Sequence, residues 1–251
     1  MITDKIKRGL NHYHTKLSAF FREKQFKAYG TRVKHMFFGA KHSDTLIVSF
    51  PACSPNQAKY NYMRTLLPYK CNKLFLLDDF GSNHQGCYLI EEHVEKCTTD
   101  LINSFIRKTK AKQLIFIGSS KGGYSALNFS FLISKVQVII GAPQYFLGAY
   151  LDKKSTRCNL DFITNGGGKK DLDERLKHKI ASSDIKPQHV YIHYSKAEHT
   201  FDEHIRFLLD DLKNAQVEVT EDIQDYPEHS CLSQYYPPYL VQTLNQILNE
   251  M

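Results

Sequence analysis

Several features that would direct a chain to a membrane or a secretory route are missing from these 251 residues. No stretch approaches the roughly 18 consecutive apolar residues that a membrane-spanning helix needs. The N-terminal segment, residues 1–12, is charged and lacks the apolar core of a secretory signal. These absences predict a cytoplasmic protein.

Metal-binding and linker patterns are also missing. The six cysteines form no C-x-x-C pair and no zinc-like spacing, which predicts reduced, mostly structural thiols and no metal site. No internal repeat or low-complexity linker divides the chain. With 42% hydrophobic and 24% charged residues, the composition is that of an ordinary soluble protein. We therefore expect one domain over residues 1–251. The cysteines are Cys53, Cys71, Cys87, Cys97, Cys158 and Cys231.

The chain has an excess of positive charge, with a formal net charge of +7 and 12 histidines in addition. A basic surface raises the local concentration of polyanionic partners. Because no helix-turn-helix, RNP-like or zinc-finger pattern is present, we do not expect a nucleic-acid partner. An anionic polysaccharide, a phosphorylated sugar or a CoA-type molecule would use the same field, and a basic surface without a partner remains the simplest alternative.

Apolar, β-branched stretches alternate with amphipathic ones along most of the chain. Strands buried on both faces and alternating with helices predict a mostly parallel central sheet with helices on both faces. Ligand sites in such sheets gather beyond the carboxyl ends of the strands. The predicted strands span residues 33–38, 44–50, 73–77, 113–117, 137–140, 189–194 and 217–222, and the predicted helices 60–67, 93–109, 122–134, 201–214 and 239–248.

Two segments lie outside this alternation. Residues 1–30 are basic with apolar positions at helical spacing over 4–27, which predicts an amphipathic helix that packs on its own domain or, alternatively, lies on a membrane surface. Residues 150–185 are charged and irregular and contain a run of three glycines, 166–168. We expect a cap-like insertion with short helices there.

A G-x-S-x-G pentapeptide, Gly118-Ser-Ser-Lys-Gly122, follows a predicted apolar strand and opens a predicted helix. In that context the central serine, Ser120, is held at a sharp turn as a nucleophile, and the backbone N–H of Lys121 faces a developing oxyanion. Ser119 has the wrong phase for this role. A phosphate-binding loop is excluded because Lys121 precedes the glycine pair, whereas a Gly/Ser turn without chemistry remains possible.

A serine nucleophile needs a base and an acid, which follow it in the order acid, then histidine. His229 lies after the last predicted strand and before the last helix, and is the candidate base. Glu198, in the turn after the preceding strand, is the candidate acid. Asp202 is its rival, and either carboxylate is alternatively a helix cap or first-turn residue.

The second oxyanion donor is expected in the loop after an early strand, Phe50-Pro-Ala-Cys53. Pro51 has no N–H to give, so Ala52 or Cys53 is the candidate, with Ala52 preferred. Cys53 as a nucleophile would require a histidine and an electropositive setting.

Four segments together resemble bacterial capsular-polysaccharide O-acetyltransferases of the α/β-hydrolase type. The Lys-Tyr-Asn-Tyr and Ser-Ser-Lys-Gly-Gly blocks are the specific parts, and the resemblance runs from about residue 30 to the C-terminus. The segments are Ser49–Tyr62, Asp78–Tyr88, Gly118–Gly123 and Gly141–Gln144.

The resemblance implies an α/β-hydrolase fold and transfer of acetyl from acetyl-CoA to a sugar hydroxyl through an acetyl-serine. It places the nucleophile at Ser120, the base at His229 and the acid at Glu198. The family's acid turn reads more like Gly-Lys-Asp-Asp, whereas this chain has Ser-Lys-Ala-Glu198, which keeps Asp202 as an alternative. It also implies a role in capsule polysaccharide synthesis, with peripheral association with a membrane-bound assembly complex as a possible context.

Substrate contacts are predicted at Lys59, Tyr60 and Arg64. The charges of Lys59, Arg64 and Lys121 would attract an anionic polymer or the phosphates of CoA, unless they are solvated surface charges. Besides a nucleic-acid binder, which rests on charge alone and would show an affinity that falls steeply with salt, two other functions remain open. One is a carboxylesterase or polysaccharide deacetylase with the same three residues, and the other is a non-catalytic hydrolase-fold partner in polysaccharide or glycoprotein export.

Overall fold

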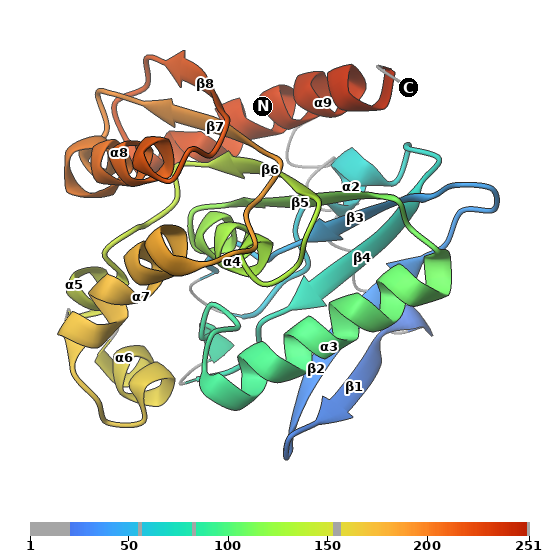
Figure 1. Ribbon diagram of the computed structural model, residues 1–251, viewed down its shortest axis with the longest axis horizontal. Coiled ribbons are helices and arrows are strands. Elements are labelled where there is room, and N and C mark those ends of the chain that lie inside the picture. The colour runs from blue at the N-terminus through green and yellow to red at the C-terminus, as the bar shows by residue number, and fades with distance from the viewer. Residues whose placement is uncertain (1–20, 55–56, 82–83, 153–156, 250–251) are drawn as a thin grey trace, which may run out of the picture.

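A computed structural model of the protein describes residues 21–54, 57–81, 84–152 and 157–249. Its centre is an eight-stranded sheet in the order β1-β2-β4-β3-β5-β6-β7-β8 (Figure 1). The strands are β1 (Lys24–Ala28), β2 (Thr31–Phe38), β3 (Thr45–Ser49), β4 (Asn72–Leu77), β5 (Gln113–Ser119), β6 (Val136–Gly141), β7 (His189–Ser195) and β8 (Val219–Gln224). The helices are α2 (Met63–Leu66), α3 (Glu92–Thr109), α4 (Lys121–Ser130), α5 (Leu147–Leu151), α6 (Arg157–Thr164), α7 (Lys169–Ser182), the π-helical turn η2 (Phe201–Ile205), α8 (Arg206–Asn214), the 3₁₀ turn η3 (His229–Cys231) and α9 (Leu232–Asn249).

The pairing of the strands identifies the architecture. β2 is antiparallel to both β1 and β4, whereas the other neighbouring pairs, from β4–β3 to β7–β8, are parallel. This order, with β3 and β4 exchanged and the following strands added in sequence, is that of the α/β-hydrolase fold. Because each parallel strand is followed by a crossover, the carboxyl ends of β3 to β8 all face one edge of the sheet.

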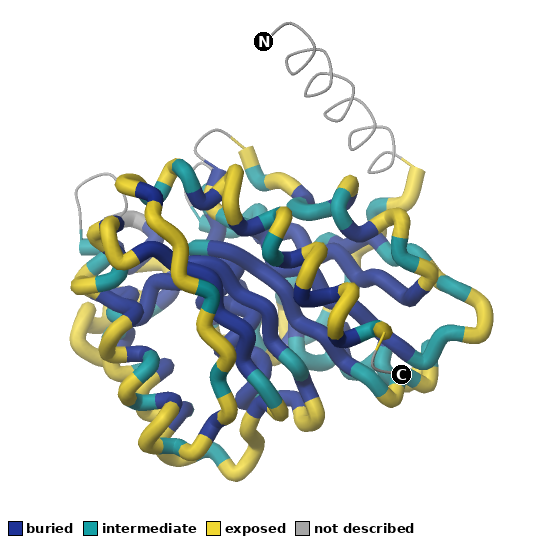
Figure 2. The backbone as a smooth tube through the Cα atoms, turned by 90° about the horizontal axis from the view of Figure 1, so that it is seen from above, coloured by how far each residue is buried: buried dark blue, intermediate teal, exposed yellow. Residues whose placement is uncertain are grey.

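Helices cover both faces of the sheet. In Figure 1, α3 and α4 lie in front of it, while α2 and α9 lie behind. The hydroxyl of Tyr69, just after α2, donates to Asn245 of α9 at 2.9 Å, which ties the two rear helices together. Strands β3 and β4 are buried throughout and mostly apolar, and Figure 2 shows the buried interior in dark blue. This burial explains their nearly continuous β-branched and apolar sequences.

The expected N-terminal helix is wrong in its last part. Residues 1–20 lie outside the described residues, but residues 24–28 form β1 rather than a helix. Tyr29 and Gly30 both have positive φ, 54° and 71°, which is the conformation of a two-residue turn between antiparallel strands. The segment therefore pairs with β2 as a hairpin.

The insertion between β6 and β7 contains α5, α6 and α7, and α7 is longer than the short helices expected there. Its division from the rest of the domain as a cap stays a prediction. Within the described part of the chain, no helix is long and apolar enough to cross a membrane.

Candidate active site

Ser120 stands alone between the end of β5 and the start of α4. Its backbone has φ 51° and ψ −121°, a conformation that is strained for a residue with a side chain and marks the sharp turn predicted from the sequence. The flanking glycines permit it. A Cβ on Gly118 would lie 2.2 Å from the carbonyl oxygen of Gly122, and one on Gly122 would lie 2.6 Å from that of Phe50. Only glycine fits at these two positions.

Two side chains from later parts of the chain form a hydrogen-bonded series with Ser120. The Oγ of Ser120 is 2.9 Å from Nε2 of His229, in the 3₁₀ turn that precedes α9. The other ring nitrogen of His229, Nδ1, is 3.1 Å from Oε1 of Glu198, in the turn after β7. Glu198 is fully buried, and the hydroxyl of Thr200 donates to the same carboxylate oxygen. The serine, histidine and carboxylate therefore form one hydrogen-bonded chain.

Glu198, and not Asp202, contacts His229. The Asp202 side chain is 78% exposed, lies in the first turn of η2, and comes within 4.0 Å of Arg206. A carboxylate inside the protein keeps its orientation on the imidazole better than one that water surrounds. The structure thus separates the two acids that the sequence left as alternatives.

The predicted oxyanion donors differ in what surrounds them. Lys121 is the first residue of α4, where a backbone N–H has no acceptor within the helix. The N–H of Ala52 already donates to Oδ1 of Asn61 at 3.1 Å. Ala52 is therefore bonded inside the protein in this conformation, and the predicted oxyanion role would require that bond to break.

The Lys121 side chain has a different role from the one expected. Its Nζ donates to Oδ2 of Asp78 at 2.8 Å and to the carbonyl oxygen of Gln85 at 3.1 Å, and both charged side chains are almost fully buried. The prediction that this charge attracts an anionic ligand is wrong, because it is neutralised and shielded from solvent.

The three predicted substrate contacts are not alike. Lys59 and Arg64 are exposed, as a binding role requires. Tyr60 is 8% exposed, and its hydroxyl donates to Glu23 at 2.8 Å. The expectation for Tyr60 is therefore corrected: this side chain belongs to the core, and its polar atom already has an acceptor.

Gln144 is a residue of the site that the sequence reasoning missed. It lies just beyond the carboxyl end of β6, and its Nε2 donates to Oγ of Ser120 at 2.9 Å. Its position after a buried strand was the available signal, because parallel strands bring their carboxyl ends together. No role was assigned to it, since only the folded structure shows which way it points.

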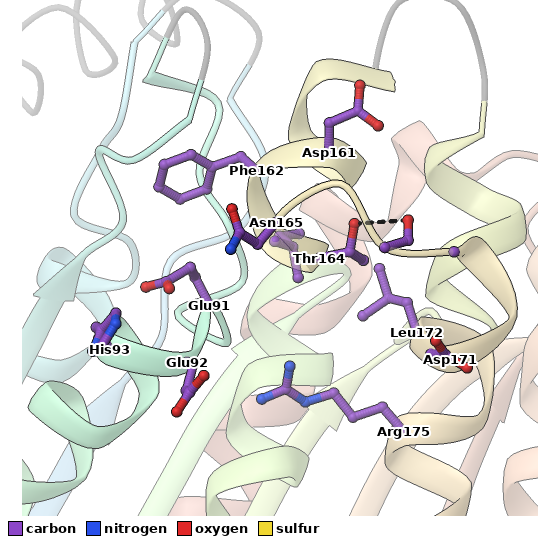
Figure 3. A pocket seen from close by; sticks show the side chains of 13 residues that line it. Glu91, Glu92, His93, Asp161, Phe162, Thr164, Asn165, Asp171, Leu172 and Arg175 are labelled. Atoms are coloured by element: carbon purple, nitrogen blue, oxygen red, sulfur yellow. Dashed lines mark hydrogen bonds between the residues drawn. The ribbon is translucent and has the colours of Figure 1, made fainter.

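Two cavities lie at this edge of the sheet. One, of about 530 Å³, is lined by Glu198, His199 and His229 among others. The other, of about 630 Å³, lies between the start of α3 and helices α6 and α7, with four carboxylates around it (Figure 3). Its acidic residues are Glu91, Glu92, Asp161 and Asp171.

Neither metal ligands nor disulfides mark the described part of the chain. Among those residues, no group of three or more histidine, cysteine, aspartate or glutamate side chains is arranged to hold a metal ion. The five cysteines whose side chains the structure describes carry free thiols, and Cys53, beside Ala52, is exposed.

Comparison with solved structures places this geometry among known folds. The capsule O-acetyltransferase of Neisseria meningitidis serogroup A is 22% identical, with a TM-score of 0.72 over 88% of this chain and 94% of that one. A mutant of it in complex with CoA gives a TM-score of 0.71 at 20% identity, with the same coverage of both chains. A fluorophosphonate-binding serine hydrolase of Staphylococcus aureus gives 0.62 at 10% identity, over 89% of this chain and 96% of that one.

A further similarity is to the Glycosylation Associate Protein complex of Streptococcus agalactiae, with a TM-score of 0.69 at 15% identity over 90% of this chain and 46% of that one. No protein-family model and no curated protein matches the chain by sequence. At these identities the solved structures establish the fold, and the predicted α/β-hydrolase fold is confirmed.

Proposed function

We propose that the protein is a serine-dependent O-acetyltransferase that moves acetyl from acetyl-CoA to a hydroxyl group of a surface or capsular polysaccharide. The observation that carries the proposal is the hydrogen-bonded chain from Ser120 through His229 to buried Glu198, built on a strained turn. The sharp turn at Ser120 does not require the contact between Oγ of Ser120 and Nε2 of His229 at 2.9 Å. The arrangement is the one that activates a weak nucleophile.

The mechanism is an acyl transfer in two steps. His229 removes the hydroxyl proton of Ser120 as Oγ attacks the thioester carbonyl, and Glu198 stabilises the imidazolium that forms. The backbone N–H of Lys121, aided by the start of α4, donates to the oxyanion. CoA leaves as the thiol with the proton from His229. A sugar hydroxyl then loses its proton to His229 and takes the acetyl group from Ser120, and His229 gives that proton to Oγ of Ser120 as the bond from Oγ to the acetyl carbon breaks.

The choice of donor and acceptor is supported by the comparisons. One similar solved structure is a mutant capsule O-acetyltransferase in complex with CoA. Exposed Lys59 and Arg64 supply positive charge for the CoA phosphates or for an anionic polymer. We also propose a cytoplasmic location, where acetyl-CoA is available, with peripheral association with a capsule assembly complex as the context.

A serine esterase or polysaccharide deacetylase is the second candidate. The His229 side chain is 25% exposed, so water has access to the base that would activate it. In a hydrolase, water takes the place of the sugar, and exclusion of water is what separates the two activities. A non-catalytic role in export is less well supported, because a binding module does not require the ordered Ser120, His229 and Glu198.

The test is the mass of the intact protein after mixing with acetyl-CoA in the absence of an acceptor. We expect an adduct of about 42 Da on the wild-type protein and none on Ser120→Ala, because the acyl group is held by that oxygen. The matched control is Ser119→Ala, because the hydroxyl of Ser119 contacts Tyr62 and not His229. We expect this variant to keep the adduct. Absence of both adduct and CoA release, with rapid cleavage of a simple acetyl ester, would replace the transferase by an esterase.

A further inference from the structure

The Gln144 side chain is held rigidly at the site. The turn that carries it is fixed on one side by a hydrogen bond from the N–H of Ala142 to the carbonyl oxygen of His193, at 2.8 Å. On the other side Pro143 packs closely on Gly123, where an added Cβ would lie 3.2 Å from the proline ring. Gln144 itself is only 1% exposed. Its contact with Ser120 is therefore built into the fold.

The contact fixes the direction of the serine proton. Oγ of Ser120 has one proton and two lone pairs, and a carboxamide nitrogen can only donate. Because Nε2 of Gln144 donates to Oγ at 2.9 Å, it occupies a lone pair. The serine proton is then directed to Nε2 of His229, also at 2.9 Å, which is the arrangement required for its removal.

The other half of the carboxamide is not used by the fold. Oε1 of Gln144 is buried and has no hydrogen-bond partner among the described residues. A buried acceptor without a partner destabilises a protein, and an apolar side chain of the same length would avoid that cost. Local costs of this kind are typical of functional positions.

One of the two predicted oxyanion donors is already bonded within the protein. The N–H of Ala52 is bonded to Asn61 in this structure, which leaves the N–H of Lys121 as the available member of the predicted pair. In the tetrahedral intermediate, Oγ and the oxyanion are bonded to the same carbon. A donor within hydrogen-bond distance of Oγ is thus within reach of the oxyanion after a small rotation.

We infer that Gln144 is a catalytic residue that supplies the second oxyanion donor through its side-chain N–H, beside the backbone N–H of Lys121. At rest, Nε2–H donates to Oγ of Ser120. As Oγ bonds to the acyl carbon, the carbonyl oxygen takes up the electron pair of the broken π bond, and Nε2–H donates to it. The serine proton goes to His229. This inference rests on the proposed serine chemistry but not on the identity of donor or acceptor.

The first test compares Gln144→Met with the wild type in the hydrolysis of p-nitrophenyl acetate. Methionine keeps the length of the side chain and removes the N–H. We expect kcat to fall about 10²-fold, with KM within about twofold, because the lost hydrogen bond is made to charge that develops in the transition state. Binding of a trifluoromethyl ketone, which forms a tetrahedral adduct on Ser120, should weaken by the same factor. Gln137→Met, at the opposite end of β6, is the control and should change neither.

A second variant separates this role from a merely structural one. In Gln144→Glu, burial favours the protonated carboxyl group, which can donate through its O–H. Its kcat should therefore fall as the pH rises through the pKa of that carboxyl group, a limb that the wild type lacks. If Gln144 had only a structural role, the kcat of Gln144→Glu would not fall in this pH range. Unchanged kcat and unchanged ketone binding in Gln144→Met would overturn the inference.

Labelling with a fluorophosphonate keeps this test apart from that of the proposed function. If Ser120 of the wild type reacts with the probe and Gln144→Met reacts about 10²-fold more slowly, the inference holds even when acetyl-CoA gives no adduct. In that case only the acetyltransferase proposal fails. If Ser120 of the wild type reacts with neither reagent, both proposals fail, because no oxyanion forms for Gln144 to stabilise.

Discussion

Glu198 and Asp202 are separated by one helical turn in the sequence, yet their surroundings are opposite. Glu198 is fully buried against His229, and Asp202 projects into solvent from η2. The sequence alone could not decide between them, because both follow the same strand and both carry a carboxylate. The direction of the turn after β7 determines which of them contacts His229, and that direction depends on contacts with Tyr226 and His229, far away in the chain.

Exchange of each acid for its amide tests this assignment. Glu198→Gln should lower kcat for acyl transfer on the order of 10⁴-fold, because an amide N–H facing Nδ1 favours the wrong tautomer of His229. Asp202→Asn, the matched control, should change kcat by no more than about twofold, since an exposed carboxylate interacts weakly. Steady-state turnover of an acetyl ester or of acetyl-CoA measures both. A larger loss in Asp202→Asn would move the acid to that position.

At the scale of the elements, most strands could be predicted, whereas the start of the last helix could not. Buried parallel strands have continuous apolar, β-branched sequences, so β3 to β7 were located within a few residues. The start of α9 was placed seven residues late, beyond the pair Pro237-Pro238. These prolines leave the carbonyl groups of Ser233 and Gln234 without helical donors. Because both residues are exposed, water can satisfy them and the helix continues.

Gln144 and β1 show a second limit of prediction. The site motif at Ser120 is local, because one short segment contains the strand end, the turn and the helix start. The pairing of Lys24–Ala28 with β2, and the approach of Gln144 to Ser120, depend on residues that come together only after folding. Local patterns therefore indicated the candidate nucleophile but not the side chain that donates to it.

The buried Lys121–Asp78 pair connects α4 to the loop after β4 and is expected to stabilise the site. Lys121→Met leaves the charge of Asp78 buried without its partner, so we expect the free energy of unfolding to fall by about 3–5 kcal/mol. The control is the exposed pair of α3: Lys96→Met should cost at most about 1 kcal/mol. Urea unfolding followed by circular dichroism gives both values. An equal loss of unfolding free energy in the two variants would show that the buried pair stabilises the protein no more than the exposed one.

At the scale of the whole molecule, Glu95 joins three helices. Its carboxylate, on α3, accepts from Lys179 at 2.6 Å and Arg175 at 2.9 Å, both on α7, and from Asn128 of α4 at 2.6 Å. Burial acts to raise the pKa of Glu95, but the charges of Lys179 and Arg175 outweigh it and hold the pKa below its ordinary value. Burial lowers the pKa of Lys179 and outweighs the charge of Glu95, which acts to raise it. We therefore assign the loss of stability in acid to the protonation of Glu95.

The lowered pKa of Glu95 makes its contribution to stability dependent on pH. A depressed pKa in the folded state stabilises the protein above the unfolded value, about 4.3, and this stabilisation is lost as the pH falls through the folded value. At pH 7, Glu95→Gln should lower the free energy of unfolding by about 1–3 kcal/mol, because bonds to two charged groups are weakened. The difference from the wild type should become smaller as the pH falls below about 4.

Urea unfolding at pH 7 and in acid measures this change, with Glu92→Gln as the control on the same helix. Glu92 is 71% exposed, and its pair with Lys96 is open to solvent, so its amide variant should differ little from the wild type at either pH. A difference for Glu95→Gln that stays constant over this range would mean that its contribution is packing, not charge. A difference that shrinks with acid means that one carboxylate holds α7, and with it the insertion between β6 and β7, against the helices beside the candidate active site.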